Sequence, residues 1–393
     1  MEQTLFSEII DKYFARSVGK IYERYNDAAL EPALLHLNAL QEEYTPNLSW
    51  NSTTLNHSII AADVVEMDTP APLQTRDVIM QASGALAKLS VAFRKGETDI
   101  ANINIMMARG GDEATLAAKV LDDVPKAIKS IKVRNEILFE QALSTGYCLV
   151  ESDKNDGKPI RVNFGFKDEN FFKANYGWDT TSATPLDDIQ QLFDAAQIDG
   201  VAIGHVWISR TYFQKLRSSS QGKTLAAAYN GIVVTSATLI PVPSKSAMLE
   251  ALKDEFGAEF HVVEGSFKVK NSEGKQETIT PWETANIVAT PSDKVGRLVY
   301  GTLAEETNPA GATTYEKAGY ILVSKYAERN PLSEYTIGQA MCLPVIDDAA
   351  DIYVLTADKA KNSSTTGGIV VNPGTGTIGG ITTGGSSSGG TAV

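Results

Sequence analysis

Histidines are the first residues whose chemistry could define a function. The sequence has four, His36, His57, His205 and His261. None of them is spaced as HxxxH or HExxH, so a zinc site would have to draw its ligands from segments that are remote in sequence. His205 precedes a valine and a tryptophan, which is typical of a histidine within a buried strand. We therefore predict no metal site.

The two cysteines, Cys148 and Cys342, are candidates for a nucleophile or a disulfide. A catalytic thiol needs a partnered, electropositive setting. Cys148 instead begins an apolar strand, and Cys342 lies within the apolar run AMCLP. No CxxC pair exists, and two thiols give no disulfide framework. We predict two small buried residues, in a chain that suits a reducing cytoplasm or is indifferent to redox state.

Two further patterns could bind a cofactor or an ion. A GxGxxG motif begins at Gly374, but a dinucleotide site needs this turn to open a helix, and a Gly/Ser/Thr-rich stretch follows it here. Asp347, Asp348 and Asp351 form the densest carboxylate group, yet they lack EF-hand spacing and indicate a solvated acidic loop. No Walker A motif occurs. We expect no catalytic residues, no cofactor and no enzyme.

Length and charge restrict the class of protein further. A chain of 393 residues with 43% hydrophobic residues can bury a sizeable core and fits about two or three domains. A net charge of −13 repels DNA phosphate, so a general duplex binder is excluded. The N-terminus has no basic segment followed by an apolar run, and no stretch reaches about 18 apolar residues. We expect neither a signal peptide nor a membrane span.

The elements that would position functional residues begin with two predicted helices, over residues 6–25 and 31–43, followed by an extended polar arm over residues 44–58. The segment KLSVAFRKGETDIANINIM alternates around RKGE, which predicts a long two-stranded ribbon within residues 63–107. Arg94 and Lys95 would form its basic tip. A hairpin of this length is not stable alone in water, so it needs a partner surface.

A long helix dominates the centre of the chain. Apolar residues recur at helical spacing from Leu116 to Ala142, and Gly146 stands where a C-cap glycine belongs. Pro125 should kink this helix, or restart it with Asp122 or Asp123 as a new cap. The whole spine would be about 33 residues, or about 50 Å long.

The remaining elements alternate between strands and helices. YCLVES and PIRVNFGF predict a hairpin across DKNDGK, and residues 185–197 predict a helix. The strand VAIGHVWIS, the short helix TYFQKLR, the β-like segment GIVVTSATLIPVP and the helix KSAMLEALKDEFG follow. Strands continue through ITPWETANIVATPS to IYVLTA. From Lys361 onward the chain is rich in Gly, Ser and Thr, which indicates a flexible or extended tail.

The order of these parts resembles the HK97-type capsid fold, and most closely the lambda-like major capsid protein E family. The segment LDDIQQLFDAAQIDGVAIGHVWISRTYFQKLR is similar to the family's entry to its axial domain, and KYAERNPLSEYTIGQAMCLPVIDDAADIYVLTA is similar to its C-terminal block. The matching residues of that block are Tyr326, Pro331, Gln339, Pro344, Asp347, Asp348 and Val354. The resemblance covers about residues 1–358. The Gly-rich tail departs from the family pattern.

The resemblance implies an α+β HK97-like capsid fold with an N-terminal arm, an extended E-loop hairpin, a peripheral domain with a long spine helix, and an axial domain. The ranges would be an N-terminal arm at 1–62, an E-loop at 63–110, a peripheral domain at 111–180, an axial domain at 181–319, a return to the peripheral domain at 320–358, and a tail at 359–393.

The resemblance also implies a function. The chain would be the major capsid protein of a tailed bacteriophage, assembling in the host cytoplasm into pentamers and hexamers of an icosahedral shell around the DNA genome. Portal, scaffold and decoration proteins would be further partners, and DNA would be enclosed without sequence-specific binding. We expect contacts between subunits from Arg76, Phe93, Arg94, Lys95, Glu97, Glu328 and Arg329.

Two other classes of protein stay open from the residues alone. Another phage structural subunit, such as a tail-tube or decoration protein, would be mostly β and would lack the long central helix. An enzyme with an α/β core and no recognisable motif is the third class, because missing motifs are weak evidence against catalysis.

Overall fold

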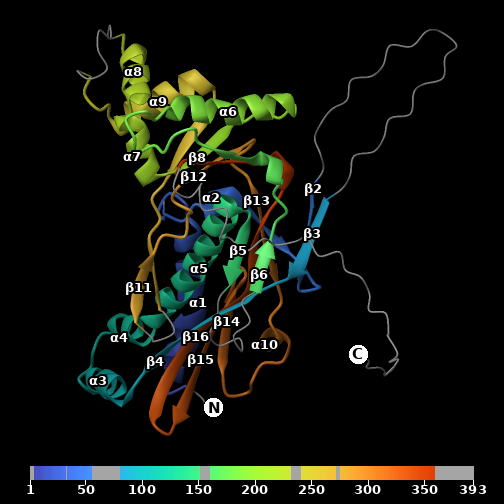
Figure 1. Ribbon diagram of the computed structural model, residues 1–393. Helices are drawn as coiled ribbons and strands as arrows, with labels where there is room; N and C mark the ends of the chain where they lie inside the picture. The colour runs from blue at the N-terminus through green and yellow to red at the C-terminus, as the bar shows by residue number, and fades with distance from the viewer. Residues whose placement is uncertain are drawn as a thin grey trace, which may run out of the picture.

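The computed structural model describes residues 4–31, 33–54, 80–150, 160–231, 240–270 and 275–358 (Figure 1). Its larger sheet has six strands among these residues, in the order β1-β13-β16-β15-β14, with β4 paired to β16. The strands are β1 (Leu40–Tyr44), β4 (Lys88–Lys95), β13 (Gly296–Gly301), β14 (Thr314–Ala318), β15 (Ile321–Arg329) and β16 (Leu332–Ile346). Only β1 and β13 run parallel; the other pairs are antiparallel.

A second sheet of five strands lies above the first in Figure 1, in the order β7-β17-β12-β8-β9. The strands are β7 (Phe171–Lys173), β8 (His205–Ser209), β9 (Glu259–Val263), β12 (Asn286–Thr290) and β17 (Tyr353–Thr356). Three two-stranded ribbons complete the described β structure: β2 (Ser49–Thr54) with β3 (Met80–Ala85), β5 (Tyr147–Val150) with β6 (Ile160–Asn163), and β10 (Phe267–Lys270) with β11 (Gln276–Ile279).

Helix α5 (Asp123–Thr145) packs against β16 of the larger sheet, and α1 (Ser7–Asn26) lies beside it (Figure 1). Gly338 of β16 allows this approach, because a Cβ there would lie 3.0 Å from Ala127 Cβ. Helices α3 (Glu97–Ala108) and α4 (Glu113–Val120) stand at one side of the same sheet. The short helix α2 (His36–Ala39) leads from α1 into β1, whereas α10 (Ala304–Thr307) and two 3-10 turns, Asp168–Asn170 and Ala349–Asp351, join strands.

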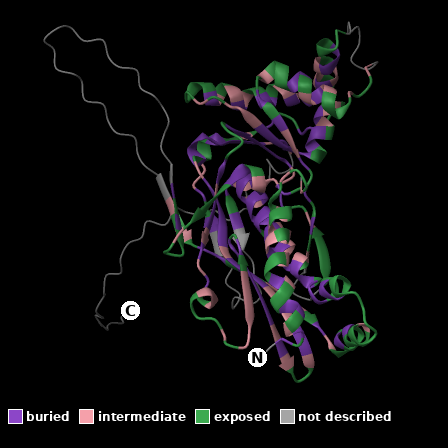
Figure 2. Cartoon of the chain, turned by 180° about the vertical axis from the view of Figure 1, so that it is seen from behind, coloured by how far each residue is buried: buried purple, intermediate pink, exposed green. Residues whose placement is uncertain are grey.

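The smaller sheet is covered on one face by α6 (Pro185–Ile198), α7 (Arg210–Ser218), α8 (Ser220–Tyr229) and α9 (Lys245–Phe256). Ser209, Ser219 and Ser244 begin three of these helices by accepting a hydrogen bond from a backbone N–H of the first turn, which satisfies a donor that would otherwise lack a partner. These helices turn exposed residues outward and buried ones toward the sheet (Figure 2).

The smaller sheet has a different hydrophobic core on each face. Along β17, Tyr353 and Leu355 belong to the core under α6–α9, whereas Val354 belongs to the core around α5. Trp207 of β8 and Val288 of β12 also face the α5 core. This alternation follows from the two-residue period of a strand. The two parts of the chain therefore share one sheet as a common wall.

Two alternatives were predicted for the central helix, a kink at Pro125 or a restart of the helix there, and the structure shows the restart. Helix α4 ends at Val120, and α5 restarts at Asp123 with Pro125 in its first turn, where a missing N–H costs nothing. Gly146 ends α5 with a φ of 79°, which confirms the predicted cap. The long helix thus has 23 residues, because the proline separates it from α4.

The predicted helix over residues 31–43 is wrong. Within its described part, only His36–Ala39 is helical, and Leu40–Tyr44 is strand β1. Its residues pair with β13 at the edge of the larger sheet, and Glu43 reaches Arg297 of that strand. Tertiary pairing has overridden the helical preference of a Leu-Gln-Glu-Glu sequence. The preceding helix is confirmed as α1.

The predicted ribbon turning at RKGE is also wrong. Residues 88–95 form β4, but Gly96 ends this strand, and Glu97 and Asp99 open helix α3 where acidic residues favour a helix start. Ile100 and Ile103 are buried at a spacing that fits a helix as well as an irregular strand. A ribbon does exist between β2 and β3, whereas residues 55–79 lie outside the described part of the chain.

Downstream, the β5–β6 hairpin, helices α6, α7 and α9, and strands β8 to β12 and β15 to β17 confirm the predicted pattern, while α8, β13 and β14 were not predicted. The turn DKNDGK, most of GIVVTSATLIPVP and the tail lie outside the described residues. The strands of the two sheets do not follow the domain ranges that were expected from the sequence. Strands β13 and β14 join the larger sheet, although residues 181–319 were expected to be axial, and β7 and β17 join the smaller one.

Candidate assembly surfaces

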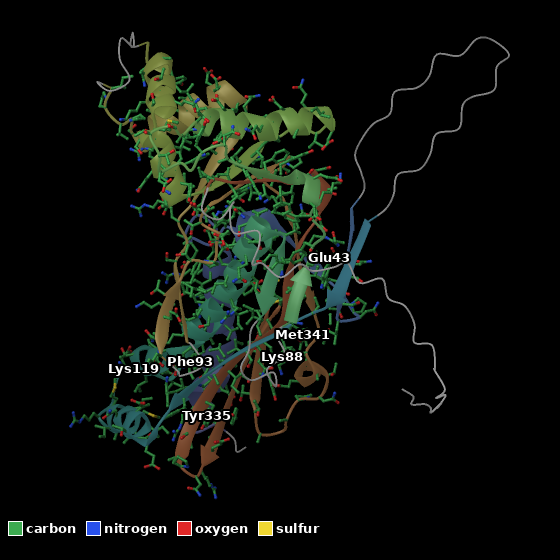
Figure 3. The ribbon with its side chains drawn as sticks, viewed as in Figure 1. Glu43, Lys88, Phe93, Lys119, Tyr335 and Met341 are labelled. Carbon is green, nitrogen blue, oxygen red and sulfur yellow. The ribbon has the colours of Figure 1, made fainter. Side chains whose placement is uncertain are left out.

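Most of the residues expected to contact other subunits gather at one end of the larger sheet. Phe93, Arg94 and Lys95 end β4, whereas Glu328 and Arg329 end β15 on the other edge of β16. We call this end, residues 93–95 and 328–332, the sheet tip. Figure 3 shows Phe93 and Tyr335 nearer this end than Lys88 and Met341, as the pairing of Lys88 with Met341 requires. The seventh residue, Arg76, lies outside the described residues.

Lys95 is buried within its own chain rather than displayed. Its ammonium bonds Asp122 and lies 2.6 Å from Asp123 Oδ2. Although burial alone would raise the pKa of Asp123, Lys126 and Lys95 together hold it below its usual value. These contacts fasten the end of β4 to the start of α5. The expectation that Lys95 stands at an exposed ribbon tip is therefore wrong.

The other members of the tip are more accessible. Arg94 is exposed, and its Nε donates to Ser333 Oγ at 2.7 Å. Phe93 is half-buried, with the Lys126 ammonium 6.0 Å from its ring centroid. Arg329 is exposed, and Glu97 is exposed where α3 begins. The tip thus presents a mixed charged and aromatic surface.

Helix α3 carries an apolar surface that the sequence reading missed. Ile100 and Ile103 face inward, but Ile105 is 49% exposed and Met107 is 41% exposed. Figure 1 shows α3 standing out beside α4, next to the sheet tip. Ile105 and Met107 are two residues apart and leave the helix in different directions, so they are two separate exposed apolar side chains on a projecting helix rather than one patch. The spacing of isoleucines in DIANINIMMA was the available signal.

A groove of about 370 Å³ lies between α1 and the α4–α5 junction. Its lining is mainly apolar and includes Tyr13, Ile21, Ala117, Leu121 and Pro125. Helix α1 forms one wall with Tyr13, Ser17 and Ile21, and the neighbouring stripe of Ile10, Phe14 and Val18 is buried in the α5 core. The backbone N–H of Leu5 also donates to Glu334 Oε2 at 3.1 Å. The start of the chain is therefore packed onto its own subunit.

Helix α5 also carries a buried acidic pair. Glu136 accepts hydrogen bonds from the His36 backbone N–H at 2.9 Å, and its carboxylate meets the His36 ring. Glu140 lies one turn further along the helix, and burial followed by the charge of Glu136 raises the pKa of Glu140 to about 9. Glu140 therefore holds a proton at neutral pH.

The cysteines, the aspartates and the GxGxxG segment were also considered for chemistry, and their settings differ. Cys148 and Cys342 are buried free thiols, as predicted, and burial raises the pKa of each to about 12. Asp347 receives two hydrogen bonds from Arg297, at 2.6 and 2.8 Å, and Asp351 is 5% exposed. The prediction of a solvated acidic loop is therefore wrong for these two. The GxGxxG segment lies outside the described residues.

The histidines differ from the expectation. His205 and His261, which are remote in sequence, meet on neighbouring strands beside Glu259. The sequence reading correctly required remote segments for such a group but predicted no site. His36 is buried against Glu136, and His57 lies outside the described residues. Within the described ranges, no helix is both long and apolar enough to cross a membrane.

Comparison with known proteins gives one family and several solved structures. A family model described as phage major capsid protein E matches residues 33–357. A candidate capsid protein from a prophage of E. coli CFT073 aligns with 87% of this chain and 98% of its own, at 17% identity and a TM-score of 0.53. A phage-related protein from Bordetella bronchiseptica RB50 aligns with 87% of this chain and 96% of its own, at 11% identity and a TM-score of 0.49. No curated protein matches the sequence.

Proposed function

The chain belongs to the phage major capsid protein E family, and on that premise we propose that it closes into an icosahedral shell of pentamers and hexamers around a DNA genome. The match of the family model over residues 33–357 carries this proposal, because it spans both sheets and the helix between them. It favours a capsid subunit over the tail-tube or decoration protein that the sequence left open. Many modest contacts repeated by symmetry can stabilise such a shell.

We assign the expected domains to the sheets. The larger sheet with α1, α4 and α5 would be the peripheral domain, and the smaller sheet with α6–α9 would be the axial domain. The β2–β3 ribbon would be the base of the E-loop, whereas Arg76 of the expected E-loop lies outside the described residues. The boundaries then follow the strands, with β13 and β14 peripheral and β17 axial.

The contacts between subunits would use the sheet tip, α3 and the groove beside α1. Arg94 and Arg329 present positive charge at the tip of a chain whose net charge is −13, so an acidic neighbouring subunit attracts them. Ile105 and Met107 of α3 supply apolar area. The groove offers an apolar recess next to these surfaces. Phe93, Glu97 and Glu328 would border the same contact.

The remaining roles follow from a purely structural function. The protein would act by assembly and would catalyse no reaction. Its acidic surface would allow packaged DNA to lie inside without adhering to the wall. Portal, scaffold and decoration proteins would be its partners in the virion, and assembly would take place in the host cytoplasm.

Expression of the chain alone, followed by negative-stain electron microscopy and light scattering, tests this function. We expect rings or closed shells. Arg94→Glu should reduce the assembled fraction, because it places a negative charge against an acidic neighbour, while leaving the folded subunit intact. Lys268→Glu, an equal charge change at an exposed position on β10, is the matched control and should assemble normally. Compact monomers at high concentration for the unaltered chain would contradict the proposal.

A further inference from the structure

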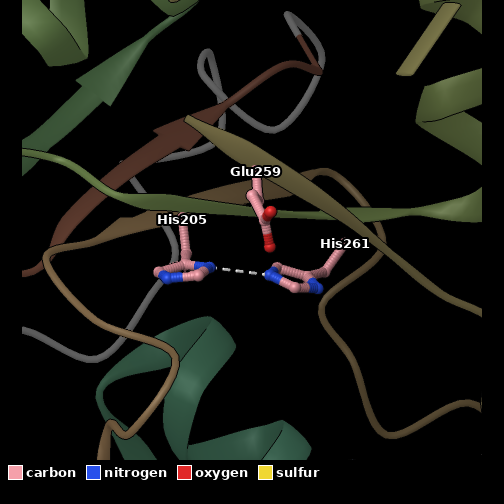
Figure 4. A group of neighbouring side chains, drawn as sticks. All are labelled: His205, Glu259 and His261. Atoms are coloured by element: carbon pink, nitrogen blue, oxygen red, sulfur yellow. Dashed lines mark hydrogen bonds between the residues drawn. The ribbon is translucent and has the colours of Figure 1, made fainter. Parts of the chain in front are cut away.

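Two histidines and a glutamate converge on adjacent strands of the smaller sheet (Figure 4). We propose that His205, Glu259 and His261 form a binding site for a divalent transition-metal ion of the zinc class. Each offers one ligand atom, and these atoms lie within 4.8 Å of one another. This inference concerns the bound ion and is independent of the proposed assembly.

The backbone holds the three residues in place before any ion arrives. Strands β8 and β9 run parallel, with His205 opposite Glu259. His261 is two residues further along β9, so its side chain leaves the same face as Glu259. The Glu259 N–H donates to the Gly204 carbonyl at 2.9 Å, which fixes the register. Gly204 is required there, because a Cβ would lie 2.6 Å from the Pro291 carbonyl oxygen.

The imidazole rings point their nitrogens at one common place. His205 Nδ1 and His261 Nε2 are 2.9 Å apart. Two nitrogens bound to a tetrahedral zinc ion at 2.0–2.1 Å would be separated by about 3.3 Å. A separation wider by a few tenths of an ångström, with each ring turned toward the ion, would therefore convert the present N–H···N hydrogen bond into a pair of metal ligands. The Glu259 carboxylate would supply the third ligand and water the fourth.

Neighbouring residues orient the ligands. Trp207 stacks on the His261 ring with the centroids 4.4 Å apart and the planes 24° apart. The indole N–H of Trp207 donates to Thr290 Oγ1 at 3.1 Å, so the stacking surface is itself fixed. A ring held in this way loses little conformational freedom when it binds an ion. The two histidines also lie half-buried, which limits competition from water.

The ligand set suits a cation. Two imidazoles and one carboxylate are the ligands of several zinc sites with an open fourth position. The Lys253–Glu259 ion pair is exposed, so it competes only weakly with a metal.

The test uses the full chain without a histidine tag, stripped with a chelator, and two probes. Isothermal titration with Zn²⁺ alone should show one equivalent per chain, and Co²⁺ should give visible absorption bands of tetrahedral intensity. Mutation of a residue that only supports a metal ligand usually lowers metal affinity roughly 10–100-fold. His205→Asn and His261→Gln remove ligands themselves, so each should lower the Zn²⁺ affinity by more than that. Glu259→Gln, at an exposed position, should weaken it as well without affecting folding.

Glu264→Gln is the matched control, because Glu264 is an exposed glutamate paired with Lys245 in the same region but outside the site. It should bind Zn²⁺ like the unaltered chain. Circular dichroism establishes that each variant is folded. Binding that persists in both histidine variants would overturn the site, and so would an absence of Co²⁺ bands in the unaltered protein. In either case the two histidines form only a hydrogen-bonded pair.

Discussion

Lys95 Nζ lies 2.6 Å from Asp123 Oδ2, and this contact joins the end of strand β4 to the first turn of helix α5. Both side chains are about 10% exposed or less. A pair so well removed from water is costly to break on one side, because the remaining charge keeps its desolvation penalty. The contact is therefore a fastening between the larger sheet and the long helix.

Replacing this lysine should destabilise the subunit. We expect Lys95→Gln to lower the free energy of unfolding by about 2 kcal/mol, less than the 3–5 typical of a broken buried pair because Lys126 still bonds Asp123. Urea denaturation of unassembled subunits measures the change. Lys119→Gln, at an exposed position of α4, should cost almost nothing. Equal effects of the two changes would show that the buried pair has no special role.

The buried acidic pair predicts a dependence of stability on pH. The pKa of Glu140 is raised from 4.5 to about 9, so the native state keeps a proton that the unfolded state releases between these values. Stability should therefore fall as pH rises through this window, by at most about 1.4 kcal/mol per pH unit. Glu140→Gln mimics the protonated form, so the variant should lose less stability between pH 5 and pH 8.5.

Denaturation curves across that pH range, compared between the unaltered chain and the variant, provide the measurement. Glu113→Gln removes an exposed carboxylate instead and should keep the pH profile of the unaltered chain. Parallel profiles for Glu140→Gln and the unaltered chain would mean that Glu140 is ionised in the folded protein.

The glycine that ends α5 should be sensitive to a methyl group for two reasons. Gly146 has a φ of 79°, and a Cβ there would lie 2.9 Å from Phe166 Cγ. Gly257, which ends α9 with a φ of 68°, has open space around its missing Cβ. Gly257→Ala should cost about 1–2 kcal/mol from backbone strain alone, and Gly146→Ala should cost clearly more. Thermal unfolding of the two variants separates the cost of backbone strain from the cost of the clash with Phe166. Equal losses of stability in the two variants would show that the clash contributes nothing.

The exposed Ile105 of α3 predicts a defect in assembly without a defect in folding. Ile105→Asp should lower the fraction of chains in shells at least tenfold, because a charge in an apolar contact is left without a partner (about 1.4 kcal/mol per tenfold change). Asn102→Asp adds the same charge at another exposed position of α3 and serves as the control. Sedimentation measures assembly, and circular dichroism measures folding. Normal assembly of Ile105→Asp would remove α3 from the contact.

The elements with a strong local signal were predictable from the sequence, and those that depend on pairing were not. Gly146 and Pro125 mark the ends of α5 because their backbone requirements are local. Strand β1 has no such mark, since its residues become a strand only by pairing with β13, more than 250 residues away in sequence. Helix α3 was misread because IANINIM satisfies both the helical and the alternating period.

The residues of the candidate surfaces also divide into those that the local sequence identifies and those that only the fold brings together. Arg94 and Arg329 were identified in sequence as possible contacts, and the fold brings them to one end of the sheet. Lys95 appeared equally exposed, because nothing local indicates that β4 ends beside Asp122 and Asp123. His205, Glu259 and His261 could not be grouped beforehand, since their proximity follows from the register of two parallel strands that are separated in sequence by α7, α8 and α9.

The sheet that belongs to two cores has a mechanical consequence. Tyr353 and Leu355 hold one face of β17 under the outer helices, while Val354 holds the other face against the core of α5. Because both faces of this wall are packed, we expect α6–α9 and the long helix to move together when force acts on either of them. Any adjustment of curvature during shell closure must then be absorbed outside this wall, in the segments that project from it.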